Sequence, residues 1–581
     1  MHVTRDIDTR CPVLAGDSML RLVSTLGGFR ETDRFEKILT GVLVALAYTS
    51  STRVLEYATD ISIDGRVARS SNPGKDARES CIRSRFMGSQ LRAPAPLLSL
   101  PVLASWTCWL TVATFMVLAS LLMLVRMRKR GASGHRRTLA FFHPFAECGG
   151  GGERVLWAAV DALVREGNGT PEYDIVIYCQ DVRTSEKSSE QVLADHANSR
   201  FNLAVPPSAF RVVPIRYRHL LVPSNYPRLT MVFQALASIV VTVECLWRGG
   251  SLPDVWVDTT GWAFGYPLLK LLDPRMSVVA YVHYPTVSSD MLMRVKNREA
   301  SYNNRARVTR SRLLSLVKAL YYQMVGYWYG FCGGCADVCM VNSSWTKAHV
   351  EEIFWWRGRR RPRGRGATLV YPPCDCVALS SVALEGRRGR DGTKQIISLA
   401  QFRPEKNHEV QLEAVRVLAE MRETGGDTGD FKVAFVGGCR DAGDFARVER
   451  LRSQTKALGL EDRVAFFVNV PFPELQRLLG ASVAGLHSMK DEHFGISVVE
   501  YMAAGAIPIA HNSAGPRMDI VTKETGYLVE TAEECAAAMA AVLGMSESDR
   551  VAMAALGRRR AELFTQEKFQ QGFLGALLSG L

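Results

Sequence analysis

Runs of apolar residues with the length of a β-strand alternate with helical segments through most of this 581-residue chain. A first strand is predicted at 138–144 and an amphipathic helix at 153–165. Further strands are predicted at 174–179, 255–258, 278–283, 338–342 and 368–371. This alternation predicts an α/β fold, in which a parallel sheet carries helices on both faces.

The pattern restarts after residues 372–392, which contain the predicted hinge. Strands are predicted at 395–401, 432–436, 464–470, 483–486 and 507–510, with a helix at 408–422. We therefore predict two facing Rossmann-like domains, at residues 138–372 and 373–581. Ligands bind at the carboxyl ends of the strands in such sheets, so we expect the functional site in the cleft between the domains.

Two glutamates, Glu492 and Glu500, flank a Phe-Gly turn between two predicted strands. The segment reads as loop, glycine turn and helix start, and the N-terminus of a helix favours phosphate. The two carboxylates could hold hydroxyls at both ends of a nucleotide sugar, or could simply form a solvated helix face. A hydrolytic pair is disfavoured, because eight helical residues rise about 12 Å and such pairs lie roughly 5–9.5 Å apart.

A glycine-rich loop joins the first predicted strand to the first helix, beginning at His143. It contains four consecutive glycines, Gly149, Gly150, Gly151 and Gly152. Glycines let backbone N–H groups approach a phosphate closely, although the loop matches neither GxGxxG nor a P-loop. A flexible loop without a ligand is the alternative.

Three more candidate residues follow predicted strands. His283 lies at the end of one strand, where it is either a site residue or a structural histidine. Arg403 and Lys406 open a helix after another. Two cations at this spacing could hold a leaving diphosphate, or could be the solvated start of a helix.

A charge-free segment at 97–125 is long enough to span a bilayer. Arginines and a lysine follow it at once, and the positive-inside rule then places the large C-terminal part in the cytoplasm. Residues 1–96 form an N-terminal extension that we expect to be disordered. Two further apolar helices are predicted at 229–246 and 313–329, either as core helices or as helices on a membrane surface.

The formal net charge of +13 is unevenly distributed. It is concentrated in residues 1–137 and in a six-arginine run at 357–365, and the remaining residues sum to about neutrality. The high pI is therefore weak evidence for nucleic-acid binding.

The thirteen cysteines follow no disulfide rhythm, and Cys332 and Cys335 form the single CxxC. Small buried residues are the favoured interpretation of that pair, over a metal or redox site.

The chain resembles the retaining GT-B glycosyltransferases of family 4, which carry a Glu-x7-Glu motif, here Glu492 to Glu500. Within that family it is similar to the α-1,2-mannosyltransferases that extend the dolichol-linked oligosaccharide precursor of N-glycans. The resembling segments are 142–157, 283–292, 341–346 and 402–407, and the resemblance covers about 138–575.

The resemblance implies a role for each candidate residue. Arg403 and Lys406 would hold the donor diphosphate, and Glu500 the nucleotide ribose. Glu492 would hold the mannose, together with the backbone of the three residues Phe494, Gly495 and Ile496. His283 would lie beside the reacting centre, and the glycine loop near the acceptor or the donor phosphates.

The resemblance also implies the substrates and the location. GDP-mannose would be the donor and Man3GlcNAc2-diphosphate-dolichol the acceptor. The fourth and fifth mannoses would be added at the cytoplasmic face of the endoplasmic reticulum, without a metal or cofactor. The expected partners are the membrane and other early mannosyltransferases of the pathway. The sequence departs from the family in its long lead before the anchor and at Gln401, where an arginine is common.

Three alternative functions remain from the residues alone. A GT-B transferase could use another nucleotide sugar or a soluble acceptor, although the predicted anchor disfavours the latter. The chain could be a catalytically silent membrane scaffold, against which Glu492, Lys406 and His283 argue. An NAD-linked dehydrogenase is disfavoured because neither half opens with GxGxxG.

Overall fold

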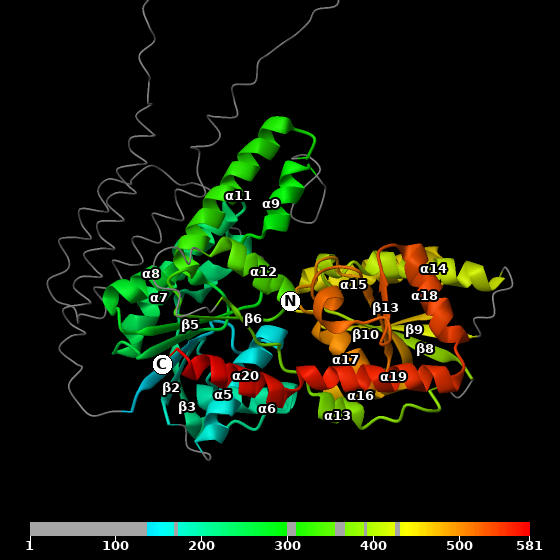
Figure 1. Ribbon diagram of the computed structural model, residues 1–581, viewed down its shortest axis with the longest axis horizontal. Helices are drawn as coiled ribbons and strands as arrows, with labels where there is room; N and C mark the ends of the chain where they lie inside the picture. The colour runs from blue at the N-terminus through cyan, green and yellow to red at the C-terminus, as the bar shows by residue number, and fades with distance from the viewer. Residues whose placement is uncertain are drawn as a thin grey trace, which may run out of the picture. The chain divides into compact units, whose positions relative to one another are not determined.

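A computed structural model describes residues 136–167, 172–298, 309–354, 366–387, 392–423 and 430–580 (Figure 1). The predicted N-terminal extension at 1–96, the predicted anchor at 97–125 and the arginine run at 357–365 lie outside the described residues.

The first half of the described chain forms a seven-stranded parallel sheet in the order β3-β2-β1-β4-β5-β6-β7. Its strands are β1 Thr138–Phe142, β2 Asp174–Cys179, β3 Phe210–Pro214, β4 Val255–Asp258, β5 Ser277–Val282, β6 Val338–Val341 and β7 Thr368–Leu369. Parallel sheets are covered on both faces, and Leu139 through Phe142 of β1 are at most 2% exposed. The sequence predicted every strand except β3.

Helices cover both faces of this sheet (Figure 1). They are α5 Gly151–Glu166, α6 Ser189–Phe201, α7 Thr230–Gly249, α8 Tyr266–Leu272, α9 Ser289–Lys296, α11 Arg312–Gly333 and α12 Ser344–Ile353. The α5 helix is anchored by Trp157, whose indole N–H donates to the Ala146 carbonyl at 3.3 Å. That bond ties the loop before α5 to the core.

The second half forms a six-stranded parallel sheet in the order β10-β9-β8-β11-β12-β13. Its strands are β8 Lys394–Leu399, β9 Phe431–Gly437, β10 Val464–Val468, β11 Ser482–His487, β12 Ile507–His511 and β13 Tyr527–Val529. Its helices are α13 Cys376–Ser380, α14 His408–Glu423, α15 Ala442–Ala457, α16 Phe472–Ala481, α17 Ile496–Ala504, α18 Ala532–Gly544 and α19 Glu547–Ala561. Two parallel sheets of this kind match the predicted GT-B-like α/β architecture.

The last helix, α20 Gln566–Leu578, returns to the first sheet and lies beside α5 (Figure 1). Phe569, Phe573 and Leu577 belong to the core of the first half and are at most 1% exposed. The Gln570 amide donates to the Asp161 carboxylate at 2.7 Å. The end of the chain, which we assigned to the second domain, therefore packs on the first.

The two apolar helices predicted at 229–246 and 313–329 are α7 and α11, and they differ in burial. Among the described residues, α7 alone is long and apolar enough to cross a membrane, and about half of it is buried in the fold. The α11 helix packs against α9 (Figure 1). It exposes a row of large apolar side chains. Eight of them are exposed: Leu313, Leu314, Leu316, Val317, Leu320, Met324, Tyr327 and Phe331.

The docking of α20 predicts a stability effect. We expect Phe573→Ala to cost about 3–5 kcal/mol, because the ring is fully buried between α20 and the first sheet. The measurement is the midpoint of the first unfolding transition in urea. Phe445→Ala is the matched control, since Phe445 is 49% exposed. Equal midpoints for the two variants would contradict the docking of α20.

Candidate active site

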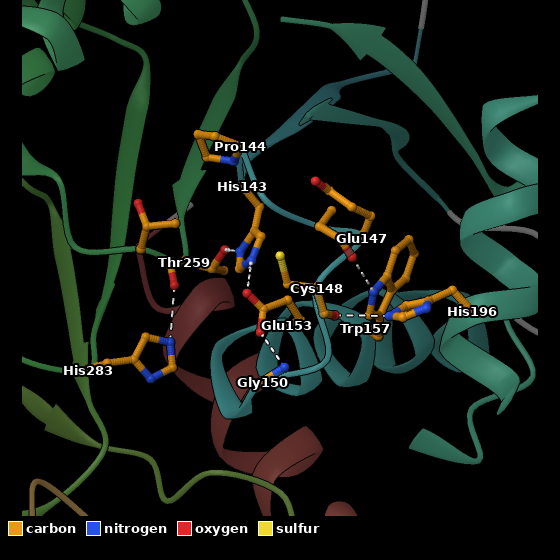
Figure 2. A network of polar contacts seen from close by, with 12 residues as sticks. His143, Pro144, Glu147, Cys148, Gly150, Glu153, Trp157, His196, Thr259 and His283 are labelled. Atoms are coloured by element: carbon orange, nitrogen blue, oxygen red, sulfur yellow. Dashed lines mark hydrogen bonds and ion pairs between the residues drawn. The ribbon is translucent and has the colours of Figure 1, made fainter. Parts of the chain in front are cut away.

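The glycine loop and His143 follow β1 and form one hydrogen-bonded cluster (Figure 2). The α5 helix begins at Gly151, and the Gly150 N–H donates to the Glu153 carboxylate at 2.7 Å. The other Glu153 oxygen lies 3.6 Å from Nε2 of His143. Burial would raise the pKa of Glu153, but the hydrogen bond with His143 holds it below its ordinary value. The helix N-terminus is thus occupied by a carboxylate of its own chain.

His283 joins the same cluster from the end of β5. Its Nε2 lies 3.1 Å from the Thr259 carbonyl oxygen, while His143 Nδ1 lies 2.7 Å from the Thr259 hydroxyl (Figure 2). The carbonyl can only accept, so His283 Nε2 carries the proton. Burial and the neighbouring His143 lower the pKa of His283 to about 4, so this imidazole is neutral near pH 7. A Cβ on Gly152 would lie 3.6 Å from His283 Nε2, which places the loop directly beside it.

The second sheet brings Lys406 and Glu492 together at the ends of its neighbouring strands β8 and β11. The Lys406 ammonium forms an ion pair with Glu492, and His487 Nε2 lies 3.1 Å from the same carboxylate oxygen. Burial would raise the pKa of Glu492, but Lys406 and the His487 hydrogen bond hold it well below its usual range. Glu492 is therefore ionised at neutral pH. The sequence had not indicated His487, although it ends a strand.

The turn after Glu492 has the backbone geometry that the glycine predicted. Gly495 caps α17 with φ of +101°, a region open to glycine and strained for other residues. The Glu492 carbonyl accepts from Gly515 N–H at 2.9 Å, which ties the Glu492 loop to the segment after β12. Phe494 is buried in the core, whereas Ile496 starts the helix.

Glu500 lies on α17, away from the Lys406–Glu492 pair. Burial raises the pKa of Glu500 to about 7, although the nearby Arg154 lowers it. Arg154 belongs to α5 of the first half, so the charge that stabilises the Glu500 carboxylate comes from the other half of the described chain. The two glutamates therefore differ in charge state near neutral pH.

Arg403 follows β8 and is only partly satisfied. It pairs with Glu405 at 3.8 Å, and its buried Nε has no hydrogen-bond partner among the described residues. Burial and Arg440 lower the pKa of the guanidinium. A buried donor without a partner is costly, and an anionic ligand would remove that cost.

A cavity of about 440 Å³ lies at the carboxyl ends of β8, β11 and β12. Its lining includes Asn407, Gln411, His487, Ser488, His511 and Asn512. Ser488 donates to the Lys406 carbonyl at 2.9 Å, so the cavity adjoins the Lys406–Glu492 pair. These polar residues were not predicted from the sequence, although His487, Ser488 and His511 lie at or just after the ends of strands.

Contacts from the first half hold the loop around Glu492 on both of its sides. The His493 ring stacks on Tyr284, with centroids 3.9 Å apart, and Arg294 forms an ion pair with Asp491. Tyr284 directly follows His283. The segment after β5 thus connects the first-sheet cluster to the residues that flank Glu492.

No group of three or more potential metal ligands occurs in the part of the chain that the structure describes. Cys332 is buried and Cys335 half-buried, both as thiols. Burial raises the pKa of Cys332 to about 12. An inert buried pair is the interpretation that these observations favour.

Two families match the chain in succession. Residues 136–354 match the family described as "ALG11 mannosyltransferase N-terminus", and residues 385–560 match "Glycosyl transferases group 1". A mouse protein is 40% identical over 448 residues, covering 76% of this chain and 87% of its own length. A human protein is 39% identical over 478 residues, covering 81% and 93%. Both are named GDP-Man:Man(3)GlcNAc(2)-PP-Dol alpha-1,2-mannosyltransferase.

The chain belongs to this mannosyltransferase family. Members occur in distant eukaryotes, since a Dictyostelium discoideum relative of the same name is 36% identical over 75% of this chain and 83% of its own. The resemblance drawn from the sequence is thereby confirmed, as is the assignment of the chain as a glycosyltransferase.

Solved structures agree on the fold. Sucrose-phosphate synthase from Thermosynechococcus elongatus superimposes with a TM-score of 0.52 at 16% identity, covering 76% of this chain and 98% of its own. The Candida albicans trehalose-6-phosphate phosphatase N-terminal domain gives 0.51 at 11% identity, covering 77% and 98%. These identities show a shared fold alone.

The Arg294–Asp491 pair predicts a coupling that a double-mutant cycle can measure in this glycosyltransferase. We expect Arg294→Gln and Asp491→Asn each to lower kcat/KM for sugar transfer by roughly tenfold, and the double variant to be no worse than either single. Asparagine tolerates the positive φ of Asp491, 58°.

The exposed pair Lys187–Asp195 is the control for this cycle. Lys187→Gln and Asp195→Asn should leave kcat/KM unchanged, since exposed pairs contribute little. Strictly additive losses for Arg294→Gln and Asp491→Asn would show that their contact does not hold the Glu492 loop.

Proposed function

We propose that this protein transfers mannose from GDP-mannose to Man3GlcNAc2-diphosphate-dolichol, adding the fourth and fifth mannoses in α-1,2 linkage with retention. The observation that carries the proposal is the partly buried Lys406–Glu492 ion pair beside a polar cavity. It supplies one cation for a diphosphate and one ionised carboxylate for sugar hydroxyls. The names of the relatives supply the identities of donor and acceptor.

The donor would bind by exchanging one anion for another. In the structure Glu492 is the partner of Lys406. The donor diphosphate carries more charge and also reaches the unsatisfied Nε of Arg403. Lys406 and Arg403 would then hold the diphosphate. Glu492, still oriented by His487, would accept hydrogen bonds from the mannose.

The remaining site residues would complete the donor and acceptor sites. Glu500 would accept from the ribose hydroxyls, and the backbone from Phe494 through Ile496 would position the mannose. Neutral His283, with its Nε2 proton already engaged by Thr259, would face the reacting centre. The loop from Gly149 to Gly152 would border the acceptor.

Same-face substitution fits these charges. The bond between the anomeric carbon and the diphosphate breaks, the acceptor hydroxyl attacks from the same side, and the leaving phosphate oxygen takes the hydroxyl proton. Lys406 and Arg403 would stabilise the charge that develops on the leaving group. With two cations in that place, we propose that transfer needs no metal and no cofactor.

We further propose that the enzyme acts at the cytoplasmic face of the endoplasmic reticulum, anchored by residues 97–125. The exposed apolar row of α11 supports contact with the membrane that carries the acceptor. Other early mannosyltransferases of the pathway are the expected protein partners. A different nucleotide sugar or a silent scaffold is less well supported, given the ionised Glu492 and the relatives.

The transfer assay tests this proposal directly. With GDP-mannose and a Man3GlcNAc2-diphosphate lipid, we expect product carrying two more α-1,2-mannoses, unchanged by EDTA. Glu492→Ala should lower the rate by at least about 10²-fold, because it removes the carboxylate that accepts hydrogen bonds from the mannose. Glu474→Ala, which removes a half-exposed glutamate paired with Arg477 on α16, is the control. An intact, GDP-binding protein that transfers no mannose would refute the assignment of the acceptor.

The titration of Glu500 gives a second test. A carboxyl with a pKa near 7 is mostly protonated at pH 6 and mostly ionised at pH 8. Since the ionised form is the better acceptor for ribose hydroxyls, guanosine affinity should rise about tenfold over that range. Guanosine has no phosphate of its own to titrate. Calorimetric titration of Glu500→Gln should give a flat profile, and an equally steep profile in the variant would exclude Glu500 from the ribose site.

A further inference from the structure

A second cavity, of about 460 Å³, lies at the carboxyl ends of β2 and β3, outside the site described so far. Four arginines line it together with His219: Arg183, Arg216, Arg218 and Arg248. One acid, Asp181, is among the lining residues. Glu147 and Glu244 pair with Arg218 and Arg248 from outside the lining, so the four guanidinium groups exceed the nearby carboxylates by one, which still favours an anion.

The side chains of Arg183, Arg218 and Arg248 pair with carboxylates, whereas Arg216 is held through its backbone N–H. Arg183 donates to Asp181 at 2.7 Å, and Arg248 donates to the buried Glu244 at 3.0 Å. Glu244 also accepts from the backbone N–H of Arg216 at 2.7 Å. Side chains fixed in this way lose little entropy when they bind a ligand, and a guanidinium has five donors to share.

One arginine connects this cavity to the glycine loop. Arg218 forms an ion pair with Glu147 and donates to the Pro144 carbonyl at 3.3 Å, and both partners belong to the loop after β1. Its guanidinium also lies over the Phe145 ring, 5.0 Å from the centroid. The basic cavity and the reacting centre thus lie on the same edge of one sheet.

The strand order sets the distance between them. His283 follows β5, and the cavity lies at β2 and β3, four strand spacings from β5 at most. At about 4.8 Å per strand this is roughly 19 Å. The acceptor named for the relatives carries five sugars ahead of its diphosphate, so its diphosphate must lie several sugar rings from the reacting carbon. The glycine loop follows β1, two strand spacings from β5, and it lies directly beside His283, so it is too near.

We propose that the arginine cavity at the ends of β2 and β3 binds the diphosphate of the lipid-linked acceptor while the oligosaccharide runs along the sheet edge toward His283. The proposal rests on the acceptor class given under the proposed function. Both functions then lie along the carboxyl edge of the first sheet. The end at β2 and β3 binds the acceptor diphosphate, and the part near β5 carries out the transfer.

The experiment compares two acceptors with the same Man3GlcNAc2 and alkyl chain, one with and one without the diphosphate. Wild type should prefer the diphosphate acceptor. In Arg183→Gln/Arg216→Gln, the KM for that acceptor should rise roughly 10- to 100-fold. Its kcat and its KM for GDP-mannose should not change, and the KM for the diphosphate-free acceptor should stay as in wild type.

Arg275→Gln is the matched control, because Arg275 also pairs with an aspartate two residues before it and is exposed. A variant that keeps the preference for the diphosphate would overturn the proposal. So would an equal loss of kcat on both acceptors, which would place these arginines in the catalytic step.

Two binding measurements separate the sources of phosphate. With the donor site saturated by GDP, inorganic pyrophosphate should bind wild type and not the double variant. This readout tests the cavity even if the protein transfers mannose to neither acceptor, an outcome that would refute the proposed function instead. Loss of binding to phosphatidylserine vesicles, with the diphosphate preference intact, would make the cavity a membrane contact and overturn the proposal.

Discussion

The ion pair between Lys406 and Glu492 is the contact on which the candidate site depends. It joins the ends of two neighbouring strands, β8 and β11, and each charge is the main compensation for the other in a partly buried place. Removing one partner would leave the other charge buried without compensation, which costs more than the pair itself contributes. The residues on either side of Glu492 contact Tyr284 and Arg294, so its position depends on both halves of the described chain.

This arrangement divides chemical roles between the two sheets. The second sheet carries the charged residues suited to a nucleotide sugar. One of them, Lys406, is paired with Glu492, which an anionic ligand can replace. The first sheet carries neutral His283 and a glycine loop whose helix N-terminus is already satisfied by Glu153. An anion would have to displace a carboxylate at either place, Glu153 at that N-terminus or Glu492 at Lys406, but beside Lys406 it would also meet the Nε of Arg403, which has no partner among the described residues. The difference favours the second sheet for the donor diphosphate.

Much of the fold follows from the sequence because buried parallel strands are continuous apolar runs. The missed strands show where that signal fails. Phe210–Pro214 includes an exposed arginine and ends in proline, and Tyr527–Val529 is only three residues long. The packing of α20 on the first sheet was also missed, because an amphipathic pattern does not tell which sheet a helix covers.

In the candidate site, too, some features were predicted from the sequence and others were not. Lys406, Glu492 and His283 were found because each follows a strand. The contacts of His487 with Glu492, of Glu153 with His143 and of Tyr284 with His493 were not predicted, since such side-chain contacts leave no periodic pattern in the sequence.

The separation of charged sites also makes electrostatic sense for an enzyme whose two substrates both contain a diphosphate. Like charges bound close together would weaken each other's binding. The arginine cavity at β2 and β3 lies roughly 19 Å along the sheet from His283. The screening length in physiological salt is about 8 Å, so two solvated diphosphates repel each other little once they lie farther apart than that length. Under the proposed function, several sugars of the acceptor separate its diphosphate from the reacting hydroxyl, which suits this spacing. The number of sugars in the acceptor must then match the distance between the arginine cavity and His283. The order of the strands in the first sheet sets that distance.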